Sequence, residues 1–71
     1  MSQKEVYEIL KSLGGRATTR EIRDEAHRRF PTLTLYSYVT NRLRRLEKKG
    51  IVRETAGMWK IVSKFYYLKK F

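Results

Sequence analysis

The sequence predicts a small single-domain α+β fold with three helices, a C-terminal β-hairpin and a short aromatic tail. Two capping boxes and a later segment of apolar residues with helical spacing mark the three helices. A glycine then separates the third helix from two short β-rich runs. A hydrophobic content of 41% is enough for a globular fold with one core, and a length of 71 residues leaves no room for a second domain.

The first helix is predicted at about residues 2–13. Ser2 and Glu5 form a capping box, in which each side chain can bond to the other residue's backbone N–H. One apolar stripe follows, made of Val6, Ile9, Leu10 and Leu13. The helix is predicted to end at Gly14–Gly15, because glycine tolerates the left-handed conformation that often follows a helix.

The second helix, at about residues 19–29, follows a short extended bridge. This bridge, Arg16–Ala17, is predicted to form a strand of one or two residues. Thr18 and Glu21 form the second capping box. The residues expected to pack inward are Ile22, Ala26 and, at the end of the helix, Phe30. Pro31 then ends the helix, because it disfavours helical geometry at the preceding residue.

The third helix, at about residues 35–49, has the sharpest division between an apolar and a polar face. Thr34 is its expected N-cap. Val39, Leu43 and Leu46 lie at i, i+4 and i+7 and therefore share one face. The opposite face carries side chains that suit a DNA groove: Ser37, Asn41, Arg44, Arg45 and Lys48.

The hairpin and the tail complete the chain. Gly50 ends the third helix, and residues 51–62 are predicted to form a β-hairpin with Gly57 at the tip of its turn. The strongest hairpin dipeptides are missing from this turn. The tail, residues 63–71, is predicted to be either a last short helix or an extended segment.

The net charge of +10 is distributed unevenly. Residues 1–35 carry seven Lys or Arg against five Asp or Glu, whereas residues 36–71 carry ten against two. A polyanionic partner would favour this concentration, because Lys and Arg release condensed counterions when they contact phosphates. The alternative is a solvated basic surface with no partner.

The order of helix, short strand, two helices and hairpin resembles that of the winged helix-turn-helix family. Residues 43–52, LRRLEKKGIV, resemble the L-x-x-L-E-x-x-G-I/V-V pattern that ends the recognition helix and begins the wing in many bacterial and archaeal regulators. The Thr18-x-x-Glu21-Ile22 start of the second helix is also similar to that family. This resemblance, over Ala17–Val62, implies that the third helix enters the major groove. It also implies that the hairpin reaches a neighbouring minor groove or phosphate.

Carried over by position, the residues that the resemblance places in the groove are Ser37, Asn41, Arg44 and Arg45. Asparagine can bond bidentately to adenine, and arginine to guanine. The other residues expected to contact DNA are Tyr38, Arg42, Lys48, Arg20, Arg53 and Lys60. Arg20, with Arg23, lies where the first helix of a helix-turn-helix crosses the DNA backbone. The alternative for all of these residues is ordinary solvated surface.

Neither catalysis nor a cofactor is expected. The chain has no cysteine, no glycine-rich phosphate loop and no paired-carboxylate constellation. His27, the one histidine, has no second ligand or nucleophile beside it and is expected on a helix surface. Trp59 is expected to pack in the core rather than to stack on a base or sugar. Without a ligand-binding domain or metal cluster, no small-molecule effector is expected either.

The predicted location is the cytoplasm, in association with the nucleoid. No apolar run approaches the ~20 residues of a membrane span, and the N-terminus has acids where a signal peptide would be apolar. The scarcity of amides, the absence of cysteine and the many charges hint at a heat-adapted source such as an archaeon or its virus or plasmid. The tail carries four apolar residues, Phe65, Tyr66, Leu68 and Phe71. They predict either packing on the first helix or a homodimer, and we favour the homodimer.

The sequence therefore predicts sequence-specific binding of double-stranded DNA, as in a transcriptional regulator. The alternatives are a winged helix module that contacts protein or RNA within a larger replication, transcription or ribosomal assembly, and a non-specific chromatin protein.

Overall fold

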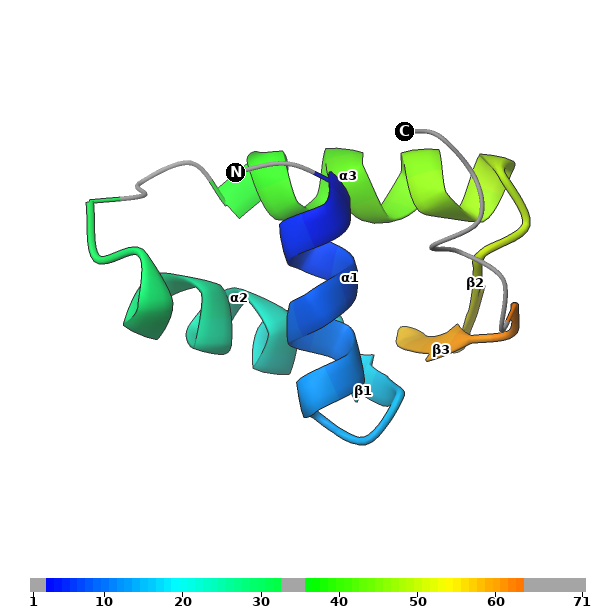
Figure 1. Cartoon of the computed structure of the whole chain (residues 1–71), viewed down its shortest axis with the longest axis horizontal. Coiled ribbons are helices and arrows are strands. Elements are labelled where there is room, and N and C mark those ends of the chain that lie inside the picture. The colour runs from blue at the N-terminus through cyan, green and yellow to red at the C-terminus, as the bar shows by residue number, and fades with distance from the viewer. Residues whose placement is uncertain (1–2, 33–35, 64–71) are drawn as a thin grey trace.

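The computed structural model of the chain describes residues 3–32 and 36–63, with the backbone alone for residues 36 and 37. Within this part, three helices pack against one three-stranded antiparallel sheet, an α+β arrangement (Figure 1). The elements are α1 (Gln3–Ser12), β1 (Arg16–Thr18), α2 (Thr19–Arg29), α3 (Tyr36–Lys48), β2 (Val52–Thr55) and β3 (Met58–Ile61). In the sheet, β3 lies between β1 and β2.

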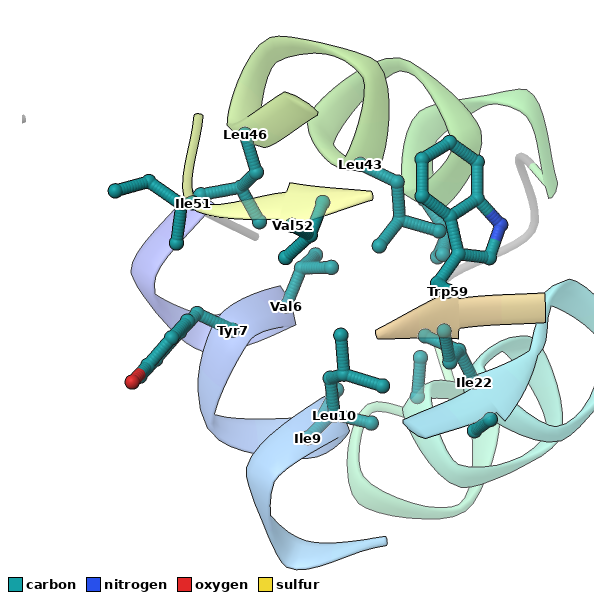
Figure 2. Close-up of a cluster of buried hydrophobic side chains, with 13 residues drawn as sticks. Val6, Tyr7, Ile9, Leu10, Ile22, Leu43, Leu46, Ile51, Val52 and Trp59 are labelled. Carbon is teal, nitrogen blue, oxygen red and sulfur yellow. The ribbon is translucent and has the colours of Figure 1, made fainter. Parts of the chain in front are cut away.

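One apolar core fills the space between the helices and the inner face of the sheet (Figure 2). The sheet contributes Ala17, Val52 and Trp59, and the loop between α3 and β2 contributes Ile51. All the helical residues expected to pack inward do so: Val6, Ile9, Leu10, Ile22, Ala26, Val39, Leu43 and Leu46 are buried, and Leu13 and Phe30 pack half-buried against them. Each buried Val, Leu or Ile side chain stabilises the fold by about 1.5–3 kcal/mol.

Tyr7 extends this core beyond the predicted stripe of α1. It is 4% exposed, and its hydroxyl points away from the cluster in Figure 2. Burial raises the pKa of the Tyr7 phenol, and the nearby Glu8 carboxylate raises it further. The ring therefore serves as apolar packing, with its polar end at the border of the core.

The start of α2 follows the predicted capping box. The Thr18 hydroxyl accepts from the N–H of Glu21 at 3.1 Å, and the Glu21 carboxylate accepts from the N–H of Thr18 at 2.8 Å. The bond from the backbone N–H of Thr18, with that from its side chain, lowers the pKa of Glu21. The predicted caps at Ser2 and Thr34 lie outside the described residues.

The end of α3 turns the chain directly into the sheet. Gly50 has a φ of 75°. Its N–H donates to the carbonyl of Glu47 at 2.9 Å, and the N–H of Ile51 donates to that of Leu46 at 3.0 Å. These two bonds form a Schellman motif, in which the buried Ile51 and Leu46 supply the usual apolar contact. The prediction that Gly50 ends the helix is confirmed.

The hairpin closes with a two-residue loop. Ala56 and Gly57 both have positive φ, 52° and 82°, as a type I′ turn requires. The Glu54 carboxylate accepts from the N–H of Gly57 at 2.7 Å and holds the turn from the strand side. Strand β1, which has three residues rather than one or two, pairs with β3 along its whole length.

Candidate nucleic-acid interface

The face of α3 that points away from the core carries several exposed polar residues. Because Val39, Leu43 and Leu46 are buried, residues half a turn away point outward. Among them, we call Asn41, Arg45 and Lys48 the outer face of α3, and Arg44, which is also exposed but has contacts toward the hairpin, is treated separately. Ser37 falls on this face by its position in the helix, and its side chain lies outside the described part.

The cations of this outer face are available to a ligand. Among residues 3–32 and 36–63, no carboxylate forms an ion pair with Arg45 or Lys48. Lys48 is the last residue of α3, where the helix macrodipole favours a positive charge. An amide and two cations are thus presented together on a helix fixed by its buried side.

Arg44 lies at the border between α3 and the hairpin rather than at the centre of the outer face. Its guanidinium is 3.9 Å from the Glu47 carboxylate and 5.8 Å from the centroid of the Trp59 ring. Its side chain is nevertheless 62% exposed. Glu47 also accepts from the backbone N–H of Glu54 at 3.2 Å, which ties β2 to α3. Arg44 is therefore oriented by the same contacts that join helix and hairpin.

Tyr38 and Arg42 lie beside each other on a flank of α3. The guanidinium carbon of Arg42 is 3.9 Å from the centroid of the Tyr38 ring, a cation–π arrangement. Both residues are half-buried. On the same flank, Lys49 Nζ donates to Gln3 Oε1 at 2.8 Å and connects the end of α3 to the start of α1. This flank is thus partly occupied by contacts within the chain.

The two arginines at the start of α2 have different surroundings. Arg20 is exposed. Arg23 is half-buried, and its guanidinium donates to the Thr40 hydroxyl at 3.3 Å, a contact that holds α2 against α3. His27 is exposed on α2, as predicted. Arg20 is therefore the better placed of the two arginines to reach a phosphate.

The predicted hairpin cations, Arg53 and Lys60, belong to a different surface. They are cross-strand partners on the outer face of the sheet, and Lys60 also pairs with Arg16 of β1. All three side chains are exposed. In Figure 1, α3 runs along one side of the molecule, whereas β1 and β3 lie toward the other. The structure therefore divides the predicted DNA contacts between two surfaces, and it adds Arg16 to the second.

Trp59 is buried, at 2% exposure, so the prediction that it packs in the core is confirmed. Its indole N–H donates to the Thr19 hydroxyl at 2.8 Å and fixes β3 to the first turn of α2. Its ring therefore supports both basic surfaces from beneath and does not offer a stacking platform.

Comparisons of the chain with protein-family models, with curated proteins and with solved structures found no match. Within the described ranges, no group of three His, Cys, Asp or Glu could hold a metal ion. The described helices include none long and apolar enough to cross a membrane. What the two basic surfaces can bind therefore has to follow from their own geometry and charge.

Proposed function

We propose that this chain is a winged helix protein that binds double-stranded DNA in a sequence-specific manner and regulates transcription at the nucleoid. In this proposal α2 and α3 form the helix-turn-helix, α3 lies in the major groove, and the β2–β3 hairpin is the wing. The observation that supports it most is the outer face of α3, where Asn41, Arg45 and Lys48 are exposed together without a described acid to pair them.

The chemistry of this face matches that of a major groove. Asn41 can bond to the N6 and N7 positions of adenine, and Arg45 to O6 and N7 of guanine. Lys48 can neutralise a phosphate as a point charge. The opposite side of α3 is held by Val39, Leu43 and Leu46 in the core, so the groove-facing side chains project from a rigid element.

The test is fluorescence anisotropy of labelled duplex DNA, titrated with the protein at several salt concentrations. Arg45→Ala should weaken binding to a preferred sequence by roughly 1–3 kcal/mol if the side chain contacts a base. An equal loss on every duplex would assign Arg45 to phosphate and favour a chromatin protein. Arg28→Ala is the matched control, because it removes the same charge from an exposed position on α2.

Two results would remove α3 from the proposed role. One is the absence of binding even at low salt, where phosphate contacts are strongest. The other is unchanged binding in both Arg45→Ala and Lys48→Ala. The stoichiometry of the complex also tests the proposed homodimer, whose predicted contacts at Phe65, Tyr66, Leu68 and Phe71 lie outside the described residues.

A further inference from the structure

Three cations form a row across the outer face of the sheet. Lys60 of β3 lies between its register partners Arg16 of β1 and Arg53 of β2. We call these three residues the basic row. Neighbouring strands are about 4.8 Å apart, so these like charges face one another at short range. Such pairs destabilise a sheet, and none of the three has an ion-pair partner among the described residues.

The basic row borders a hollow of about 490 Å³ that also has an apolar part. The other residues that line it are Thr55, Met58 and Val62. Val62 is 45% exposed and is the one large exposed hydrophobic residue in the described part of the chain. The hollow therefore combines three cations, which no described acid pairs, with apolar surface that no described segment covers.

Nucleic acid matches only half of this surface. A duplex would offer phosphates to the basic row but nothing to Met58 and Val62. A single strand would need aromatic side chains on which its bases could stack, and the lining of the hollow contains none. In Figure 1 the two strands β1 and β3 also lie across the molecule from α3, where the proposed duplex would bind.

An acidic peptide matches both halves. Carboxylates pair with arginine in a bidentate manner and with lysine as a point charge, and an apolar side chain between them would cover Met58 and Val62. Five of the six lining residues are exposed and Met58 is half-buried, so the hollow is open enough for a polymer to pass across it. We propose that the outer face of the sheet docks an acidic segment of a partner protein, with carboxylates on both sides of an apolar residue.

This proposal replaces the predicted phosphate contacts of Arg53 and Lys60 and does not depend on DNA binding by α3. The probe is a fluorescently labelled peptide of alternating glutamate and leucine, compared with an all-glutamate peptide of equal length. The alternating peptide should bind more tightly, because only it fills the apolar part of the hollow. Equal affinity for the two peptides, or no binding of either, would overturn the proposal.

Variants separate the two basic surfaces. Arg53→Gln with Lys60→Gln should weaken binding of the alternating peptide by about tenfold or more and should weaken duplex binding much less than Arg45→Ala does. Arg45→Ala should do the reverse. Val62 is exposed, so Val62→Ser leaves the core intact. This variant should weaken binding of the alternating peptide and leave binding of the all-glutamate peptide unchanged. If the double variant instead lost duplex binding and kept peptide binding, the basic row would belong to the DNA surface and the inference would be wrong.

Discussion

The outer face of α3 and the basic row are both cationic and enclose the same core, but they are assembled in different ways. Asn41, Arg45 and Lys48 lie three or four residues apart and share a face in any α-helix. The basic row joins Arg16 to Arg53 and Lys60 from the other end of the sequence, and only the strand order β1-β3-β2 brings them together. The residues of a helical surface thus follow from their spacing in the sequence, whereas the residues of a sheet surface depend on the order of its strands.

The two surfaces also differ in what they do to stability. Lys48, at the C-terminal end of α3, is favoured by the helix macrodipole by about 0.3–1 kcal/mol. Each cross-strand pair of like charges in the basic row is unfavourable by a similar amount. A cation at the end of a helix is therefore explained by stability alone. The basic row is not, and the proposed acidic partner would supply the missing explanation for its three cations.

The largest expected effect comes from the residue beneath both surfaces. Trp59→Ala should destabilise the fold by about 3–5 kcal/mol, because it empties the centre of the core and removes the bond to Thr19. A domain of this size has little stability to spare, so most of the variant should be unfolded in thermal denaturation monitored by circular dichroism. Both DNA and peptide binding should be lost together.

Trp59→Phe is the control for this prediction. It keeps most of the apolar ring and removes the indole N–H, so the loss should be smaller and the two surfaces should remain. If Trp59→Ala kept DNA binding while it lost peptide binding, α3 would be folded independently of the sheet, and the idea of a shared support would fail.

Breaking the contact between α3 and β2, which joins the two surfaces, should have the next largest effect. Glu47→Ala removes the acceptor for the N–H of Glu54 and the ion-pair partner of Arg44. We expect a loss of about 0.5–1.5 kcal/mol in urea denaturation and faster hydrogen exchange at the Glu54 amide. Glu47→Gln keeps an acceptor oxygen and should recover most of this loss. Unchanged exchange at Glu54 in Glu47→Ala would show that β2 is held to α3 by packing alone.

The sequence was sufficient for the elements whose signals are local. The Thr18–Glu21 capping box, the Gly50 helix end and the buried face of α3 all follow from residue type and spacing, and the structure confirms each of them. The core role of Trp59 also follows from its chemistry, because a large ring in so small a domain is most stable when it is buried.

Features that depend on tertiary contacts were beyond the sequence. No local pattern connects Arg16 with Lys60, because their register depends on β1 joining the sheet beside β3. The position of Arg44 beside Trp59 and the bond of Arg23 to Thr40 likewise require the packed elements. Tyr7 was missed for a related reason. It lies at the edge of the α1 stripe, and only neighbouring elements can bury it there.

Reversing one charge in the basic row should have a smaller effect, and it should stabilise the fold rather than destabilise it. Lys60→Glu converts two repulsive cross-strand pairs, with Arg16 and Arg53, into attractive ones. We expect the free energy of unfolding to increase by about 0.2–1 kcal/mol for each pair while peptide binding is lost. Lys60→Gln should give a smaller gain, because it only removes repulsion. If high salt failed to reduce the gain of Lys60→Glu, the effect would not be electrostatic.

The smallest expected effect lies on α2, in an ion cluster that belongs to neither basic surface. Bonds from Arg28 and then Arg29 lower the pKa of Glu25 from 4.5 to about 2. Because the pKa is lower in the folded state, this stabilisation is present above pH 4.5 and is lost as the pH falls toward 2. Thermal denaturation of Glu25→Gln should therefore show a lower midpoint than the original chain at neutral pH, and the two midpoints should converge in acid. A difference that stayed constant down to pH 2 would mean that Glu25 acts through packing rather than charge. Neither Arg45 nor Lys60 belongs to this ion cluster. DNA binding and peptide binding at neutral pH should therefore be unchanged in Glu25→Gln.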